Sequence, residues 1–405
     1  MKSKKSNKKK IIIRSGSLRM GGLERVLIEA LQTIDREKYE ISLLITDDSG
    51  KDNIFLKDIP QDIKVYFLKP ESLMRETEQY RLKRKDSLYN KFMYNYMMWK
   101  ERGIILENTK KCLKEIGETE IFIDYDWGAT KYIDKLDVKK SVVWIHNSIP
   151  SLLGNRKDKI ERFGRRLNKY TKVVAICDEM KEEIERIYPY LKGKVERVYN
   201  PFNFERIEKL AEDKSELTPE QQDLMKEKYC VAVSRLDNVQ KDYPTLLRAF
   251  KILKDKGIEE KLFIIGDGPS RAEIEKQIDE LQLNDQVKLI GLTKNPYVWM
   301  KNSDFFVHSS KYEGLPTVLI EAMICDKVVI SSDCPTGPKE ILSGGDCGIL
   351  YPVGDEIQLA KDIESFLLNK DIQEKYFGKL KLRRDEFNKN TVIREYERLI
   401  ENTIE

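Results

Sequence analysis

The sequence predicts an α/β protein built from two doubly wound, Rossmann-like domains that face a cleft. Short β-branched apolar runs are each followed by a helical pattern, which is typical of parallel α/β units. This alternation occurs twice along the chain, and 405 residues with 40% hydrophobic content and 13 prolines are enough for two cores. Ligands of such folds bind outside the carboxyl ends of the strands, so the cleft is the expected site.

The first domain is expected over residues 1–200. Helical patterns occupy residues 22–34 and 178–188. The lysine-rich residues 1–9 show no apolar periodicity, so we expect them to be disordered. Apolar runs predict strands at residues 10–14, 40–46, 63–68, 120–125, 141–146 and 172–177.

The second domain is expected over residues 201–385, because the polar segment 211–222 separates two similar series of strands and helices. The helical pattern is clearest at residues 359–369, and we expect a C-terminal helix over residues 386–405 that could pack back on the first domain. Strands are predicted at residues 229–235, 261–266, 286–291, 304–309, 327–332 and 348–351.

Charge is divided unevenly between the two halves. The first 200 residues carry 43 lysines and arginines against 31 acids, an excess of +12, and the remaining residues carry 30 against 38, or −8. An anionic partner of the first half would explain this excess, although solvated helix faces would explain part of it. We do not expect nucleic acid as the partner, because the interleaved aromatic and glycine motifs of known modules are missing.

Cysteine and histidine are too few and too scattered for a disulfide framework or a zinc site. The six cysteines form no C-x-x-C pair, and there are two histidines. The basic N-terminus has an apolar run of three isoleucines, which is too short for a signal peptide, and no stretch approaches the length of a membrane span. We therefore expect a cytoplasmic protein.

One basic stretch of the first half is also rich in aromatic residues and methionine. Residues 81–102, RLKRKDSLYNKFMYNYMMWKER, suit a helix on the surface of an anionic bilayer, and residues 156–172 add eight cations against two acids. Alternatively, the aromatic residues belong to the core and only the cations are exposed. Peripheral contact with the inner face of the cell membrane and binding of acceptor phosphates alone are both open at this point.

A glycine-rich loop, GSLRMGGLERV at residues 16–26, follows the first strand and precedes a helix. In such a loop, backbone N–H groups around Gly21 and Gly22 can face an anion at the helix N-terminus. The loop is not G-x-G-x-x-G, so a nicotinamide cofactor is disfavoured. An ordinary tight turn between strand and helix is an equal alternative.

Similar loops recur in the second half. In SRLDNVQKD, Arg235 and Lys241 follow a strand, and two cations at that edge suit a diphosphate. A pair of solvated loop charges is the alternative. IGDGP, with Gly266 and Gly268, is a second turn from strand to helix at the same edge, which could be structural only.

The stretch YEGLPTVLIEAM places Glu313 and Glu321 on either side of Pro316. Pro316 is suited to the first turn of a helix, so Glu313 should lie in the preceding loop and Glu321 in the middle of the helix. The neighbours of Glu321 are apolar, which predicts a core-facing position where a carboxylate needs a partner. Together with the preceding loops, these residues are expected to converge on one edge of one sheet.

The motifs GGLER, SRLDNVQKD, IGDGP, HSSKYEGLPTVLIEAM and SSDCPTGPKEIL closely resemble those of the retaining nucleotide-sugar glycosyltransferases of family four, also called glycosyl transferases group 1. These enzymes have the GT-B fold. The resemblance extends from residue 10 to about residue 385, and its most specific part is the glutamate pair together with Arg235 and Lys241. It implies transfer of a hexose or N-acetylhexosamine from a nucleotide-diphosphate sugar, UDP-linked, to a cell-surface polysaccharide or lipid-linked glycan.

The resemblance also implies roles for individual residues. Arg235 and Lys241 would hold the donor diphosphate, Glu313 would contact the transferred sugar, and Glu321 would accept hydrogen bonds from the ribose. His146, after the predicted strand SVVWIH, would face the sugar, whereas His308 is expected to be structural. Further donor-binding positions would be Gly21, Gly22, Gly266, Gly268, Leu292, Thr293, Gly314, Leu315, Pro316, Thr317 and Val318.

Cofactors are not expected. No D-x-D motif lies near the predicted diphosphate site, because DYD at residues 124–126 is in the first half. Cations and helix ends can stabilise a departing diphosphate without a metal ion. Two alternatives remain, a nucleotide-sugar epimerase of the same architecture and a non-catalytic GT-B partner subunit, although the complete Glu, Arg and Lys set disfavours the latter.

Overall fold

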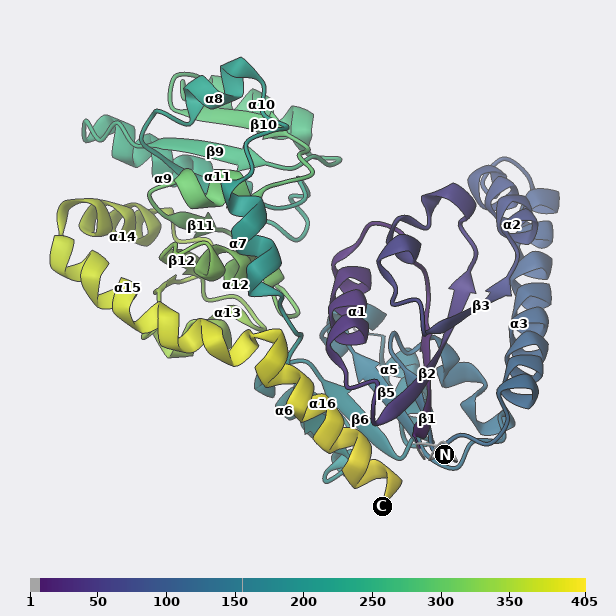
Figure 1. The fold of residues 1–405 in the computed structure, drawn as a ribbon. Coiled ribbons are helices and arrows are strands. Elements are labelled where there is room, and N and C mark those ends of the chain that lie inside the picture. The colour runs from purple at the N-terminus through teal and green to yellow at the C-terminus, as the bar shows by residue number, and fades with distance from the viewer. Residues whose placement is uncertain (1–7, 155) are drawn as a thin grey trace. The chain divides into compact units, whose positions relative to one another are not determined.

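The computed structural model describes residues 8–154 and 156–405. Contacts within the chain divide it into two compact units, each built around a parallel sheet (Figure 1). The first unit holds the chain up to Ile176, Lys181–Pro201 and Val392–Glu405, and the second holds Cys177–Met180 and Phe202–Thr391. The main division therefore falls between Pro201 and Phe202.

The sheet of the first unit has the strand order β3-β2-β1-β4-β5-β6-β7, and all its pairs are parallel. The order reverses between β1 and β4, which makes a topological switch point at their carboxyl ends. The strands are β1 (Lys9–Ser15), β2 (Tyr39–Asp47), β3 (Lys64–Lys69), β4 (Ile121–Asp124), β5 (Ser141–Ile145), β6 (Lys172–Ala175) and β7 (Val195–Arg197).

Helices surround this sheet because each has an apolar face to bury. In α1, the residues from Val26 to Leu31 are buried, and in α3 the buried residues include Met97 and Cys112. Ser87 caps α3 by accepting a hydrogen bond from the Asn90 N–H at 3.1 Å. The helices are α1 (Gly22–Thr33), α2 (Glu71–Lys83), α3 (Leu88–Ile116), α4 (Ile149–Leu153), α5 (Lys157–Leu167) and α6 (Asp178–Ile187).

The C-terminal helix α16 (Lys389–Ile404) completes the first unit from Val392 onward. Its Tyr396 hydroxyl lies 3.0 Å from that of Tyr125, and its ring lies 5.2 Å from Trp144, centroid to centroid. Glu395 accepts two hydrogen bonds from Arg197 at 2.9 and 3.0 Å. The end of the chain is therefore part of the core beside β4 and β5.

The sheet of the second unit has the order β10-β9-β8-β11-β12-β13, again all parallel. Its switch point lies between β8 and β11. The strands are β8 (Tyr229–Val233), β9 (Lys261–Ile265), β10 (Val287–Gly291), β11 (Phe306–His308), β12 (Val329–Ser332) and β13 (Ile349–Tyr351).

An aromatic cluster forms part of the core of the second unit. The ring of Tyr229 stacks on Phe263 at 4.4 Å, and Trp299 packs edge-on against Phe263 at 6.0 Å. The helices are α7 (Phe204–Glu212), α8 (Pro219–Leu224), α9 (Tyr243–Asp255), α10 (Arg271–Glu280), α11 (Tyr297–Asn302), α12 (Thr317–Ile324), α13 (Pro338–Ile341), α14 (Glu356–Leu368) and α15 (Lys370–Arg384).

Two details differ from the sequence prediction. The stretch 81–102 is not a single helix, since α2 ends at Lys83 and α3 begins at Leu88. Strand β1 begins at Lys9, which pairs with Tyr39, although Lys9 belongs to the stretch 1–9 that was expected to be disordered. Residues 1–7 of that stretch lie outside the described residues. In the described part of the chain, no helix combines the length and apolar character needed to cross a membrane.

Candidate functional site

The loops after β8 and β11 bring Lys241 and Glu313 together at the carboxyl edge of the second sheet. An isolated antiparallel bridge joins Lys241 to Ser310. It is flanked by hydrogen bonds from the Asp242 N–H to the Ser309 carbonyl, at 3.0 Å, and from the Lys311 N–H to the Gln240 carbonyl, at 2.8 Å. The two loops therefore form one rigid surface at the switch point, where ligands of doubly wound sheets bind.

The carboxylate of Glu313 is the centre of this surface. It is 8% exposed and forms an ion pair with the Lys241 ammonium. It also accepts hydrogen bonds from Ser310 Oγ at 2.7 Å and from Gln240 Nε2 at 3.0 Å, and its Oε1 lies 3.3 Å from His308 Nε2. Burial opposes ionisation, but the His308 hydrogen bond and the Lys241 charge hold the pKa of Glu313 at about 2.

Arg235 differs from Lys241 in that its side chain is exposed. It is the second residue after β8, and the next residue, Leu236, is buried and anchors the loop. The Lys241 side chain is 8% exposed and held by Glu313, so its ammonium is fixed in place. The structure therefore brings the two predicted cations into one loop, where one is exposed and the other is buried.

Two glycines allow the loop after β9 to lie against the loop after β8. Gly266 has φ +140°, and a Cβ there would lie 1.9 Å from the Ser234 carbonyl oxygen. A Cβ at Gly268 would lie 2.4 Å from the Leu236 carbonyl oxygen. The two loops are also joined by a hydrogen bond from the Leu236 N–H to the Asp267 carbonyl at 3.1 Å. Both glycines are thus required for close backbone approach.

The segment before α12 is packed just as closely. Pro316 is the N-cap of α12, and the residues Thr317 and Val318 form the first turn. Gly337 has φ +96°, and a Cβ at this position would lie 2.7 Å from the Gly314 carbonyl oxygen. The first turn of α12 follows Glu313 by four residues and has no side-chain cap, and N–H groups at a helix N-terminus can bind an anion.

Glu321 lies in α12 as predicted, but it is not the more buried glutamate. Its side chain is partly exposed, whereas Glu313 in the loop is buried. The reason is that Ser310, Gln240 and Lys241 satisfy Glu313 internally. Burial still raises the pKa of Glu321 to about 7, against the opposing charge of Arg206.

The remaining predicted residue pair in this unit, Leu292 and Thr293, follows β10. Leu292 is 79% exposed, and Thr293 Oγ1 accepts a hydrogen bond from the Asn295 N–H at 3.3 Å. Thr293 thus shapes its own turn, while Leu292 offers an exposed apolar surface.

Gly21, Gly22 and His146 belong to the first unit. Gly21 is the N-cap of α1 in an extended conformation, and Gly22 is its first residue. His146 directly follows β5 and is 9% exposed, and its Nε2 lies 2.7 Å from the Tyr125 carbonyl oxygen. Burial lowers the pKa of His146 to about 4, so its imidazole is neutral at physiological pH.

The switch point of the first sheet holds a charged cluster that the sequence analysis did not identify. The guanidinium of Arg14 is buried and forms ion pairs with Asp126 and, at 3.3 Å, with Asp124. Thr46 accepts another hydrogen bond from it, and Tyr170 donates to Asp124 at 2.6 Å. The two aspartates of DYD therefore bind an arginine. The signal that could have revealed this is Arg14 at the end of an otherwise apolar strand.

The sequence analysis also missed three members of the Glu313 surface: His308, Ser310 and Gln240. His308, which was expected to be structural, lies between Ser331 Oγ and Ser310 Oγ, at 3.1 Å from each, and contacts Glu313. Each of the three residues is close in sequence to Lys241 or Glu313. That proximity is the signal by which they could have been found.

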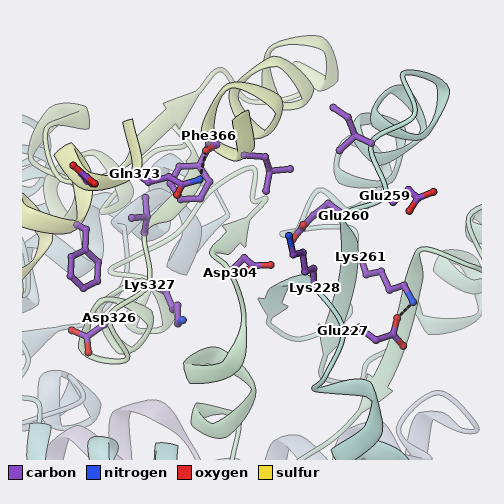
Figure 2. A pocket seen from close by; sticks show the side chains of 15 residues that line it. Glu227, Lys228, Glu259, Glu260, Lys261, Asp304, Asp326, Lys327, Phe366 and Gln373 are labelled. Atoms are coloured by element: carbon purple, nitrogen blue, oxygen red, sulfur yellow. Dashed lines mark hydrogen bonds and ion pairs between the residues drawn. The ribbon is translucent and has the colours of Figure 1, made fainter. Parts of the chain in front are cut away.

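Figure 2 shows a pocket of about 930 Å³ at the opposite, amino edge of the second sheet. Its lining includes Lys228, Glu260 and Asp304, which precede β8, β9 and β11. Burial and the charge of Asp304 raise the pKa of Glu260 to about 8. The lining contains none of the predicted site residues, and ligands of these folds bind at the carboxyl edge, so we place the candidate site at Glu313.

The second unit also matches a known family. Residues 213–381 match the family model described as glycosyl transferases group 1. This stretch lies within the second unit and contains Arg235, Lys241, Glu313 and Glu321. The second unit is therefore similar to a glycosyl transferases group 1 domain.

Relatives with assigned names extend over more of the chain. An uncharacterized glycosyltransferase of Methanocaldococcus jannaschii is 28% identical over 80% of this chain and 89% of its own length. A Campylobacter jejuni protein is 26% identical over 95% of this chain and 96% of its own length. Its name describes an α-1,4-N-acetyl-D-galactosaminyltransferase and a glycan on diphospho-undecaprenol.

Solved structures confirm the fold. Anabaena HepE, in complex with UDP and glucose, superposes with a TM-score of 0.72 at 17% identity, over 96% of this chain and 99% of that chain. The trehalose-6-phosphate synthase OtsA gives 0.73 at 13% identity, over 97% and 99%. The chain thus has the predicted GT-B fold of two Rossmann-like domains.

Proposed function

We propose that this chain transfers a hexose or N-acetylhexosamine, with retention of configuration, from a UDP-linked sugar to a cell-surface polysaccharide or lipid-linked glycan. The observation that carries the proposal is the ionised Glu313, held by Lys241 beside the N-terminus of α12. The UDP bound to HepE supports the choice of nucleotide, and the name of the Campylobacter relative supports the class of acceptor.

Lys241 and Arg235 would bind the donor diphosphate. Negative charge develops on the diphosphate as the sugar leaves, and preorganised cations stabilise that charge most when they do not have to move. Lys241 is already fixed by Glu313, and the first-turn N–H groups of α12 add a partial positive charge. This set of groups supplies the electrostatic stabilisation without a metal ion, so we propose that none is essential.

Glu313 and Glu321 would bind hydroxyl groups of the donor. Glu313 Oε2 accepts a hydrogen bond from Gln240 and keeps capacity for a sugar hydroxyl. Glu321 is partly exposed on α12 and would accept from the ribose. The reaction would follow a front-face route, in which the leaving phosphate and the incoming hydroxyl share one side of the sugar and no protein nucleophile is needed.

A panel of UDP-, GDP- and ADP-hexoses and N-acetylhexosamines tests this proposal. We expect one UDP-sugar to raise the melting temperature and to be hydrolysed slowly, with activity that survives EDTA. NMR of the product formed with an acceptor glycan should show the donor's anomeric configuration. No stabilisation and no nucleotide release by any donor would contradict the proposal.

The same assay separates the alternatives. A nucleotide-sugar epimerase converts the donor alone into an isomeric sugar nucleotide, which NMR of the mixture without acceptor would detect. A non-catalytic partner subunit binds the nucleotide but releases no product. We expect neither result.

A further inference from the structure

The tip of the α2–α3 hairpin in the first unit exposes a group of large apolar side chains. Figure 1 shows α2 and α3 side by side next to β3. We call the group the hairpin patch. It consists of Leu82, Leu88, Tyr89, Phe92, Tyr96 and Trp99, whose exposed fractions are 72%, 85%, 65%, 66%, 44% and 69%. The alternative that these aromatic residues belong to the core is therefore wrong for Phe92, Tyr96 and Trp99.

Most of the patch lies on one face of α3. Tyr89, Phe92, Tyr96 and Trp99 are spaced by three or four residues, so their side chains form a continuous stripe. The exposed apolar area is large for the surface of a soluble domain, where such patches mark interaction sites.

The opposite face of α3 holds the helix in this orientation. Glu101 is 5% exposed, forms an ion pair with Lys69 at 3.2 Å and accepts a hydrogen bond from Thr77 of α2 at 2.5 Å. Turning the stripe inward would expose Met97 and break the buried Glu101 contacts, which is costly. The exposure of the stripe is thus a property of the packed fold.

Positive charge surrounds the patch. Between residues 81 and 102 the chain has seven cations and two acids, and one of those acids, Glu101, is buried in its ion pair. A hollow of about 570 Å³ at the turn of the hairpin is lined by Arg84, Lys85, Ser87, Leu88 and Lys91. Three cations at the N-terminus of a long helix suit a phosphate group.

We propose that the hairpin patch docks on the surface of an anionic lipid bilayer. Its aromatic and leucine side chains would enter the boundary between headgroups and acyl chains, where Trp and Tyr are favoured. Arg84, Lys85 and Lys91 would bind lipid phosphates. This inference goes beyond the proposed transfer reaction and does not depend on it, because it rests on the hairpin alone.

Charge complementarity favours a bilayer over a second copy of this chain. Two hairpin patches facing each other would bring Arg84, Lys85 and Lys91 of both copies, six cations, into one interface. Like charges at close range repel, whereas anionic headgroups attract every one of these side chains. The patch therefore matches a surface that is both anionic and able to take up apolar groups.

Co-sedimentation of the full chain with vesicles tests the proposal. We expect binding to vesicles of equal parts phosphatidylcholine and phosphatidylglycerol, weaker binding at high salt, and little binding to phosphatidylcholine alone. Replacing Lys83, Arg84, Lys85 and Lys91 with serine should lower the partition constant at least about a hundredfold, because each cation near an anionic surface contributes a factor of about five. Equal binding to both vesicle types would overturn the proposal.

A second variant separates the apolar contribution from the charge. Phe92→Ser combined with Trp99→Ser should abolish binding to vesicles at high salt. The matched control, Leu368→Ser with Leu382→Ser, removes apolar side chains of the second unit that are 76% and 78% exposed. We expect this control to bind vesicles like the wild type. Binding should shift the tryptophan emission to shorter wavelength, and Trp99→Phe should remove that shift. Donor hydrolysis in solution should be unchanged in all of these variants.

Self-association is the remaining outcome. Analytical ultracentrifugation without vesicles should show a monomer for the wild type. A dimer that the Phe92→Ser, Trp99→Ser variant dissociates would overturn the proposal, because a second copy would then cover the patch. Absence of donor hydrolysis by the wild type would instead count against the proposed function, so the two failures can be told apart.

Discussion

The carboxyl edges of the two sheets bury charge in different ways. In the first unit, Arg14 is enclosed by Asp124, Asp126 and Thr46, so its guanidinium is occupied by internal partners. In the second unit, Lys241 pairs with Glu313, while Arg235 in the same loop remains exposed. The first edge is built to hold strands together, and the second keeps cationic groups within reach of a ligand.

This difference teaches that a buried ion pair at a switch point is not by itself evidence of a binding site. Both edges have such a pair, and both lie where ligands of these folds are expected. At the second edge, the exposed Arg235 lies in the same loop as the paired Lys241, whereas Arg14 at the first edge is itself buried. The following predictions separate a scaffold role from a ligand role at each edge.

The largest expected effect is on stability, at Arg14. Arg14→Met leaves the buried Asp124 without its cation, which should lower the free energy of unfolding by about 3–5 kcal/mol. Urea unfolding followed by circular dichroism measures this. The exposed Arg75, paired with Glu71, is the matched control, and Arg75→Met should cost about 1 kcal/mol or less. Equal losses in the two variants would contradict the scaffold role.

Lys241 should show the next largest effect, on activity. Lys241→Ala removes a fixed positive charge beside the leaving diphosphate. The loss of transition-state stabilisation should be about 2–4 kcal/mol, which lowers kcat/KM roughly 30- to 1,000-fold. The variant should still fold, since Ser310 and Gln240 continue to bind Glu313. Steady-state kinetics at low donor concentration is the measurement, with the exposed Lys276→Ala as control. Wild-type kinetics in Lys241→Ala would exclude the assignment.

Much of the fold was predictable from local sequence because buried parallel strands need runs of β-branched residues. The runs at residues 10–14 and 327–332 predict β1 and β12 to within a few residues. By contrast, β7 (Val195–Arg197) has three residues and no apolar run, so it depends on pairing with β6. The break between α2 and α3 depends on the cap at Ser87, which the continuous basic pattern does not reveal.

The site was predictable in part. The glycines and cations were found because each follows a strand, but their mutual contacts are set by long-range pairing. Lys241 and Glu313 are 72 positions apart and meet because the backbone bridge aligns their loops. The greater burial of Glu313 than of Glu321 likewise results from partners in other loops, which local apolar pattern does not reveal.

Arg235 sharpens the comparison because its side chain is exposed. Arg235→Ala should leave the free energy of unfolding within about 0.5 kcal/mol of the wild type. It should nevertheless weaken binding of a UDP-sugar by roughly 1.5–3 kcal/mol, since a charge-assisted hydrogen bond to the diphosphate is lost. Thermal denaturation and isothermal titration calorimetry test the two halves of this prediction. A change in stability without a change in affinity would assign Arg235 to the scaffold.

The smallest expected effect is the pH dependence of donor affinity through Glu321. Its pKa of about 7 in the folded chain exceeds the usual 4.5, so this group favours the folded state below about pH 4.5, and that stabilisation is lost as pH rises to about 7. Ribose hydroxyls donate to the ionised form, so affinity for UDP-glucose should rise by up to about tenfold between about pH 6 and pH 8. Glu321→Gln should show a flat profile and bind about 0.5–1.5 kcal/mol more weakly at the upper pH. His146, with a pKa of about 4, does not titrate in this range. If calorimetry shows the same donor affinity for the wild type across this pH range, the assignment of Glu321 to the ribose is wrong.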